Sequence, residues 1–129
     1  MRIFGARRWL MDFADQPPAR SESVEEMTLF VSSPGVECYL ARVDGKVAGG
    51  GALSFWNGMA RLFCASTLRQ FRGRGVQTGL LQTRLVRAAE SGSDMATCLA
   101  GPGSTSQRNI VRHGFQTLDT RAKFERHWR

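Results

Sequence analysis

The sequence predicts an α+β fold built on a mixed, mainly antiparallel sheet, and two patterns carry this prediction. Asp44-Gly45 and Asn57-Gly58 separate strand-like segments, and such dipeptides favour two-residue hairpin turns. After Gly75 the apolar spacing changes to the three-and-four spacing of an amphipathic helix. We therefore expect a three-strand meander, followed by alternating helices and strands.

The N-terminal third of the chain predicts a loop, a short helix and the start of the meander. Residues 14–21 read as a loop, and Ser23 with Glu26 forms a capping-box pattern for a helix that ends near residue 31. The three strands of the meander are expected at residues 37–43, 46–56 and 59–67. The glycine triplet at residues 49–51 indicates either space for a ligand or a strand bulge.

The C-terminal half predicts helix, strand, helix and strand in that order. The helix that begins at Gly75 has an apolar face at Leu81, Leu85, Ala88 and Ala89, with Arg84, Arg87 and Glu90 opposite. Residues 94–99 predict a strand parallel to residues 59–67, because a helix connects the two. Ser104 and Gln107 cap a second helix that closes at Gly114, and residues 115–124 predict a terminal strand with Leu118, Ala122 and Phe124 on one face.

The composition fits one globular domain. Of 129 residues, 42% are hydrophobic and 22% are charged, and no apolar run is long enough to span a membrane. Residues 1–36 form a divergent N-terminal segment, and residues 37–126 form the expected core. The net charge of +7 raises the hypothesis of a nucleic-acid partner, but the arginines are scattered and argue against it.

The three cysteines do not predict a disulfide framework or a metal site. Cys38, Cys64 and Cys98 are odd in number, far apart and without ligand spacing, so no metal is expected. Each lies in an apolar stretch, which favours buried free thiols in a reducing compartment and therefore a cytoplasmic protein.

Residues 69–81 are the most informative segment, because a glycine-punctuated loop leads directly into a helix. Gly73 and Gly75 permit positive φ angles and leave room for a ligand at the backbone. The helix start offers unpaired N–H groups and the positive end of its dipole, which suits phosphate. The loop also supplies three cations, Arg69, Arg72 and Arg74.

Residues 70–75 fit the pattern Gln/Arg-x-x-Gly-x-Gly/Ala and resemble the acyl-CoA site of the GNAT superfamily of N-acetyltransferases. The dinucleotide fingerprint fails because Thr78 stands at its third glycine, and no P-loop Gly-Lys-Ser/Thr follows. Residues 104–115, which end in Gly114-Phe115, resemble the late helix of the same enzymes. The resemblance covers roughly residues 37–120.

The resemblance implies that acetyl-CoA is the co-substrate and that a small-molecule or peptide amine attacks the thioester directly. It places the pantothenate amides along Ser66, Thr67 and Leu68. It places the pyrophosphate on the loop and helix start, with contributions from Gln70, Arg72, Gly73, Arg74, Gly75, Val76 and Gln77. No cysteine nucleophile is required.

Two catalytic groups common in the family are absent at the matching positions. Residues 61–67 contain no carboxylate, and Ile110 stands where a tyrosine acid is common. Base duty then falls to water, and protonation of the thiolate to Ser104, Ser106 or water. Ser106 and Asn109 are the candidates for contacts near the sulfur, although helix capping and surface polarity explain them equally well.

Three functional hypotheses remain open. An acetyl-CoA-dependent N-acetyltransferase leads, a non-catalytic or fragmentary GNAT domain that binds acyl-CoA or a partner is second, and a small basic nucleic-acid-binding module is third. The family's first strand and helix have no clear counterpart in residues 1–13, so the chain is degenerate there, truncated, or completed by another subunit. An uncovered edge at residues 37–43 would favour a homodimer or a marginally stable monomer.

Overall fold

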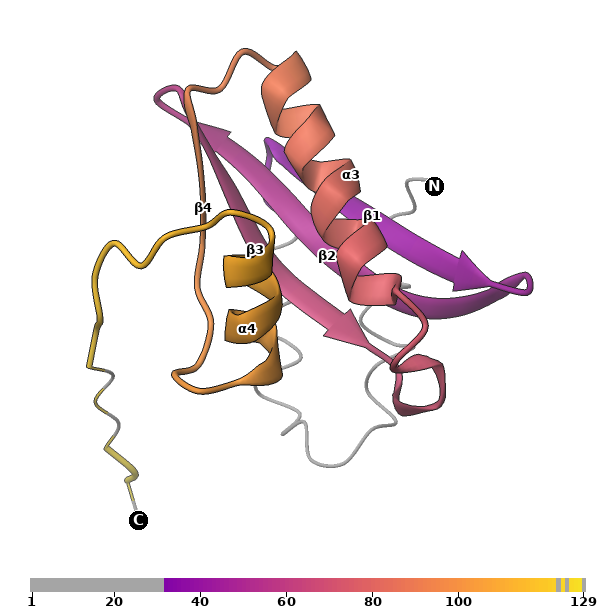
Figure 1. The fold of residues 1–129 in the computed structure, drawn as a ribbon. Coiled ribbons are helices and arrows are strands. Elements are labelled where there is room, and N and C mark those ends of the chain that lie inside the picture. The colour runs from indigo at the N-terminus through magenta and orange to yellow at the C-terminus, as the bar shows by residue number, and fades with distance from the viewer. Residues whose placement is uncertain (1–31, 123, 125, 129) are drawn as a thin grey trace. The chain divides into compact units, whose positions relative to one another are not determined.

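The computed structural model describes residues 32–122, 124 and 126–128, and the chain divides after Leu99 into two compact units. The first contains β1 (Val36–Val43), β2 (Lys46–Trp56), β3 (Met59–Thr67), a short 3-10 helix η1 (Arg69–Phe71), α3 (Val76–Glu90) and β4 (Met95–Cys98) (Figure 1). The second contains α4 (Thr105–Arg112). The loop and the capped helix predicted before residue 32 lie outside the described residues.

The four strands form one sheet in the order β1-β2-β3-β4, which confirms the mixed, mainly antiparallel α+β prediction. The first three are antiparallel and the β3–β4 pair is parallel. Both hairpins turn at two residues with positive φ, Asp44-Gly45 at 51° and 77° and Asn57-Gly58 at 52° and 77°. These left-handed pairs match the twist of the flanking strands, so the register of the meander follows from the turns.

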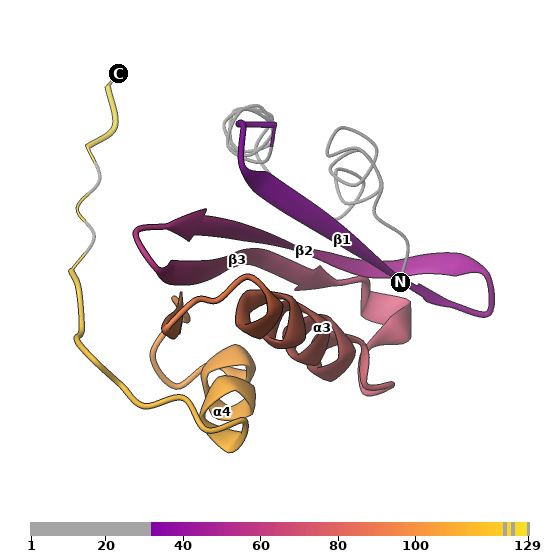
Figure 2. The same cartoon turned by 90° about the horizontal axis from the view of Figure 1, so that it is seen from above.

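Helix α3 packs on one face of the sheet (Figure 2). Its buried side chains are Val76, Leu80, Leu81, Arg84 and Ala88, and four of them repeat at intervals of four residues. The sequence-based face was therefore partly wrong, because Arg84 is buried and Ala89 is exposed.

Glycines in β2 allow this helix to approach the sheet closely. A Cβ added at Gly49 would lie 2.6 Å from the Ser66 carbonyl oxygen and 2.7 Å from Val76 Cγ1. One added at Gly51 would lie 2.9 Å from Arg84 Cζ. The space at these two glycines is therefore occupied by packing within the protein, and a bulge does accompany them at Gly50–Ala52 in the β2–β3 register.

The opposite face of the sheet carries a separate apolar cluster. Cys38, Leu40 and Ala52 are buried in it. Cys38 and Ala52 are partners in the β1–β2 register, so alternation along both strands places the cluster away from α3. The partly buried side chains packed against it are Val36, Val47, Phe63 and Cys64.

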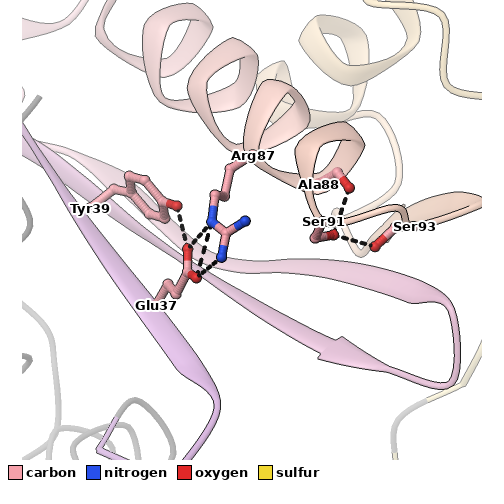
Figure 3. A network of polar contacts seen from close by, with 6 residues as sticks. All are labelled: Glu37, Tyr39, Arg87, Ala88, Ser91 and Ser93. Atoms are coloured by element: carbon pink, nitrogen blue, oxygen red, sulfur yellow. Dashed lines mark hydrogen bonds and ion pairs between the residues drawn. The ribbon is translucent and has the colours of Figure 1, made fainter.

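A polar network ties β1 to the last turns of α3 (Figure 3). The Arg87 guanidinium donates to both carboxylate oxygens of Glu37, with Nη2 2.7 Å from Oε1 and Nε 3.0 Å from Oε2. The Tyr39 hydroxyl donates to Glu37 Oε2 at 2.6 Å. The Arg87 hydrogen bonds hold the pKa of Glu37 below its ordinary value of 4.5, while burial partly opposes them. Burial, followed by the bond to Glu37, raises the pKa of Tyr39.

The second unit confirms one prediction and overturns another. Ser104 caps α4 by accepting a hydrogen bond from the Gln107 N–H at 3.0 Å, and Gly114 follows the helix with a φ of 88°. The predicted terminal strand at residues 115–124 is wrong, because its described residues form no strand, and Leu118 and Phe124 are 83% and 91% exposed. The alternating apolar residues of this segment predict which side chains share a face, but they do not supply a partner strand. A strand needs such a partner for the hydrogen bonds of its backbone groups.

Replacing Gly49 with alanine should destabilise the protein. The new methyl group meets a backbone oxygen that cannot move without disturbing β3, so we expect a loss of about 1–3 kcal/mol in the free energy of unfolding. Gly79→Ala is the matched control, because no atom lies within 4 Å of its added Cβ. This control should be stabilising by roughly 0.5–1 kcal/mol, as expected for alanine inside a helix. Urea denaturation measures both, and equal midpoints would contradict the close approach.

The Glu37 network should make stability depend on acidity. A carboxylate with a depressed folded-state pKa stabilises the protein above its unfolded pKa, and this contribution disappears as the pH falls through the folded value. The difference in melting temperature between wild type and Glu37→Gln should therefore be full above pH 4.5 and shrink below it. Asp119→Asn removes an exposed pair with Arg121 and should change little. If the difference in melting temperature between wild type and Glu37→Gln stayed the same above and below pH 4.5, this dependence on pH would be refuted.

Candidate functional site

The candidate site begins where β3 ends, and two buried side chains anchor the loop that follows. Leu68 and Phe71 are 9% and 8% exposed. The Leu68 N–H donates to the Ala48 oxygen at 2.8 Å, and the Phe71 N–H donates to the Leu68 oxygen at 2.9 Å. Residues 72–75 are exposed beyond these anchors, so a fixed base carries an accessible loop.

Among the described residues, no side chain caps the start of α3. Gly75 is the N-cap residue, has a φ of 76°, and makes no side-chain capping bond. The first turn contains no acidic residue, and the first intrahelical donor is the Gly79 N–H, which bonds to the Gly75 oxygen at 2.9 Å. Most helix starts use a side-chain oxygen or an acid at this place. This start is therefore suited to an anion from outside the chain.

The two loop glycines are required for conformation and leave open space. Gly73 and Gly75 have φ angles of 73° and 76°, in the left-handed region that favours glycine. An added Cβ at either position would meet no atom within 4 Å. The loop is therefore shaped by backbone torsion rather than by packing, and its surface is open to a ligand.

Three arginines surround this loop, and they differ in their contacts. Arg74 forms an exposed ion pair with Asp44 at 3.3 Å, and its Cζ lies 5.9 Å from the Phe71 ring centroid. Arg69 and Arg72 are exposed, and within the described part of the chain their guanidinium groups make no ion pair or hydrogen bond. The guanidinium groups of Arg69 and Arg72 are thus available to an anion. Arg74 would have to leave Asp44 in order to bind it.

Beside the loop, β3 has an open edge. The parallel pairing with β4 stops at Leu62 and Cys98, whereas β3 continues to Thr67. Among the described residues no strand of the sheet pairs with this last part of β3 on that side. Because Leu68 bonds back to β2, alternation turns the backbone of Thr67 toward the open edge.

A bulge interrupts the β2–β3 pairing in the same part of β3. The β2–β3 register passes from Gly50–Ser66 to Ala52–Phe63, so Cys64 and Ala65 lie opposite Gly51. Cys64 has a φ of 52°, which is uncommon for a residue with a side chain. Bulges bend a strand and redirect its groups, and this one does so where β3 separates from β4.

Arg84 is the residue that sequence reasoning missed. It was expected on the solvent side of α3, but its side chain is 3% exposed and donates to the backbone oxygens of Leu80, Ala52 and Phe63. Burial lowers its pKa to about 10, so the guanidinium stays charged at neutral pH. Two features of the sequence could have indicated that Arg84 is buried. It lies four residues after the buried Leu80, and Gly51 in β2 leaves room for its guanidinium.

The predicted catalytic pair lies on α4, in the second unit. Ser106 and Asn109 are partly buried and three residues apart, on one side of the helix. Asn109 Nδ2 is buried without a hydrogen-bond partner in the described residues. Its backbone oxygen lies 2.7 Å from His113 Nδ1. The roles of both residues stay predictions.

The cysteines are free thiols with little nucleophilic character. Cys38 is buried, and Cys64 and Cys98 are partly buried. Burial raises the pKa of all three, that of Cys64 to about 11. No group of three metal-ligating side chains occurs within the described residues. In that same part of the chain, no helix has the length and apolarity that a membrane span needs.

Among the described residues, a helix start without a side-chain cap lies beside an open strand edge, and the comparisons place the chain in a family. A family model described as the acetyltransferase (GNAT) family matches residues 5–115, so the chain belongs to this family. The match extends further toward the N-terminus than the two motifs do. No curated protein sequence matches the chain.

Solved structures of acetyltransferases share the fold. AAC(6')-Iy in complex with the bisubstrate analogue CoA-S-monomethyl-acetylneamine has a TM-score of 0.72 at 16% identity, over 98% of this chain and 97% of that one. AAC(6')-IG from Acinetobacter haemolyticus, an aminoglycoside 6'-N-acetyltransferase, has a TM-score of 0.68 at 19% identity, over 100% of both chains. Ribosomal-protein-alanine N-acetyltransferase from Brucella melitensis biovar Abortus 2308 has a TM-score of 0.68 at 15% identity, over 98% and 97%.

Proposed function

We propose that this protein is an acetyl-CoA-dependent N-acetyltransferase in which an acceptor amine attacks the thioester carbon directly. The observation that carries the proposal is the uncapped, acid-free start of α3 at Gly75, next to the open edge of β3. The first feature suits a pyrophosphate and the second suits the amides of an extended pantetheine arm. Family membership and the fold support the same assignment.

The pyrophosphate would lie against residues 72–77, with the N–H groups of the first turn of α3 and the guanidinium groups of Arg72 and Arg74 as donors. Gln70 is exposed at the entrance of this loop. The carboxylate of Asp44 would give up Arg74 to the ligand, whereas Arg72 has no such competitor among the described residues. Arg72 is therefore the arginine expected to contribute most.

The pantetheine arm would lie along Ser66, Thr67 and Leu68, with the backbone of Thr67, which faces the open edge, as its hydrogen-bond partner. Leu68 contributes less as a donor, because its N–H is already bonded to Ala48. When bound, acetyl-CoA supplies an activated acyl group, and the chain aligns it against the amine and excludes competing orientations. The strand contains no carboxylate, so we assign the removal of the amine proton to water. Ser106 and Asn109 remain the proposed contacts near the sulfur.

The acceptor in this proposal is an amine of the kind that acetyltransferases with this fold acetylate. The neighbouring structures include enzymes for aminoglycosides and for a ribosomal-protein alanine, so both classes belong in the first screen. Three free thiols fit a reducing environment, and a cytoplasmic location is part of the proposal. The second candidate function, acyl-CoA binding without turnover, is favoured by the missing carboxylate on β3 and by Ile110.

Acetyl-CoA should raise the melting temperature of the wild-type protein, and loop variants should reduce this effect. Gly75→Val forces a β-branched residue into a left-handed conformation and should abolish binding. Arg72→Gln should weaken binding about tenfold, and less so at high salt, because it removes one charged hydrogen-bond donor. Arg61→Gln, an exposed arginine elsewhere on β3, is the matched control and should bind like wild type.

Calorimetry measures these affinities, and release of free CoA in the presence of an amine panel measures turnover. Unchanged affinity in a folded Gly75→Val protein would refute the site. Binding without turnover across the panel would instead support the second candidate function.

Acetyl transfer should leave no covalent acyl-enzyme. With a pKa of about 11, Cys64 has a thiolate fraction roughly a hundredfold below that of an unconstrained cysteine. Cys64→Ala should therefore keep most of the turnover, to within about threefold, provided that it folds. Rapid quenching and intact-mass measurement would detect an acetyl-cysteine, and its appearance on the reaction timescale would contradict direct transfer.

A further inference from the structure

A small cavity lies at the end of α3 away from the Gly75 loop, between the β2–β3 turn and the turn that follows the helix. Its volume is about 200 Å³. The residues that line it are Phe55, Trp56, Asn57, Gly58, Met59, Ser91, Gly92 and Ser93. β3 begins at this cavity with Met59 and ends at the candidate acyl-CoA site with Thr67. At about 3.3 Å per residue, roughly 25 Å of strand separates the two sites.

Backbone bonds fix the two walls of this cavity, which we call the Trp56 cavity. Asn57 and Gly58 turn with φ angles of 52° and 77°, and Gly92 follows the end of α3 with a φ of 77°. The Asp94 N–H donates to the Gly58 oxygen at 2.8 Å and so ties the second turn to the first. The Trp56 cavity is therefore built into the connection between α3 and the hairpin.

The apolar side of the Trp56 cavity is an exposed aromatic ring with flexible neighbours. Trp56 is 71% exposed and pairs with Met59 in the β2–β3 register, and Met59 pairs with Met95 in the β3–β4 register. Directly opposed partners share a face of the sheet, so the three side chains form one row. Methionine adapts to the shape of a ligand, and an indole ring attracts a cation over its face. Among the described residues, no cation lies over the Trp56 ring.

The polar side of the Trp56 cavity offers a hydrogen-bond acceptor. The Ser91 hydroxyl donates its single hydrogen to the Ala88 oxygen at 2.6 Å, since a carbonyl oxygen can only accept (Figure 3). The Ser93 hydroxyl oxygen lies 2.9 Å from that of Ser91 and must therefore be the donor of this second bond. Both hydroxyl hydrogens are used within the chain. Ser93 thus presents only lone pairs to a ligand, which suits a donor group.

The charges beside the Trp56 cavity are negative. Asp94 Oδ2 would lie 3.3 Å from a Cβ added at Gly58, so this carboxylate stands next to the lining. Asp94 is exposed, and its side chain forms no ion pair or hydrogen bond with the described part of the chain. The negative end of the α3 dipole and the exposed Glu90 lie on the same side. The charge of Arg87 is neutralised by its two bonds to the Glu37 carboxylate.

The chain itself shows how an arginine meets such a surface. Arg126 Cζ lies 4.1 Å from the centroid of the Trp128 ring, and Arg87 Cζ lies 5.3 Å from that of Phe55. A guanidinium group is planar and weakly hydrated, so it can stack on an indole ring while its N–H groups reach oxygen atoms in its own plane. An ammonium group is compact and strongly hydrated, and it gains less from the same ring.

We propose that the Trp56 cavity binds the side chain of an arginine in a partner polypeptide. The guanidinium group stacks on Trp56 and donates to Ser93 Oγ and to the Asp94 carboxylate, while its alkyl stem lies on Met59. Cavities that enclose a free small molecule usually measure about 300–1,000 Å³. The Trp56 cavity is smaller and is rimmed by exposed residues such as Asn57, which suits one side chain of a larger molecule.

Two matched peptides test this proposal. The probe is a short peptide, blocked at both ends, with one central arginine, and its control carries citrulline, which has the same shape without the charge. NMR titration of the full chain with the arginine peptide should shift the amides of residues 55–59 and 91–94, with a Kd on the order of 1 mM. The citrulline peptide should bind at least about tenfold more weakly, because it loses the charged hydrogen bonds and the cation–π contact. Neither acetyl-CoA nor a free amine is present, so the result is independent of the proposed function.

Variants of the Trp56 cavity should weaken binding of the arginine peptide. Trp56→Leu removes the ring and Asp94→Asn removes the charge, and each should raise the Kd about threefold to tenfold. Asp94→Asn should also make binding less dependent on salt. Trp128→Leu is the matched control, because it removes a similarly exposed tryptophan whose ring already holds Arg126, and it should bind like wild type.

Three results would overturn the proposal. The first is equal binding of the arginine and citrulline peptides, and the second is an unchanged Kd in Trp56→Leu and Asp94→Asn proteins that keep the wild-type melting temperature. The third concerns a second copy of the chain as the occupant. Sedimentation would then show a wild-type dimer that Trp56→Leu dissociates, while the arginine peptide shifts no amide of the Trp56 cavity.

Discussion

The close contact between α3 and the glycines of β2 is the constraint on which the rest of the structure depends. Gly49 admits the first turn of the helix to the sheet, and Gly51 admits the guanidinium of Arg84 in the middle. With these two points fixed, the helix start at Gly75 lies at the end of β3. The opposite end of α3 brings Arg87 to Glu37 on the outer strand. The packing at these two glycines therefore sets the position of the loop, the shape of β3 and the attachment of β1.

The candidate chemistry of this chain depends mainly on its backbone. The helix N–H groups at Gly75, the left-handed glycines of the loop and the free edge of β3 need few particular side chains, apart from the arginines that add charge. A site of this kind can tolerate wide sequence change, because almost every residue supplies the same backbone donor and acceptor. The side chains that matter most in such a site are those that hold the backbone in place. Arg84 is the clearest of these.

Local patterns predicted the elements whose conformation is decided locally. Both hairpins were placed to the residue, because Asp-Gly and Asn-Gly accept two consecutive positive φ angles, and the Ser104 cap was found by its spacing from Gln107. Arg84 was misplaced, because pattern reasoning assigns charge to solvent and cannot see backbone carbonyls across the sheet. The strand at residues 115–124 failed for a related reason, since pairing is decided by a partner. Ser106 and Asn109 lie in the second unit, and a local sequence pattern carries no information on how one unit is placed relative to another.

The uncompensated positive charge at the start of α3 would make the stability of this protein depend on any anion that it binds. Arg69, Arg72 and the helix dipole repel one another in the free protein, and only Arg74 has an acidic neighbour there among the described residues. A polyanion that relieved this repulsion would bind the folded chain in preference to the unfolded one. At a hundredfold excess over its Kd, it would add about 2.7 kcal/mol to the free energy of unfolding. Starvation for the anion would increase the unfolded fraction that proteases remove, so the cellular lifetime of the protein would follow the supply of its ligand.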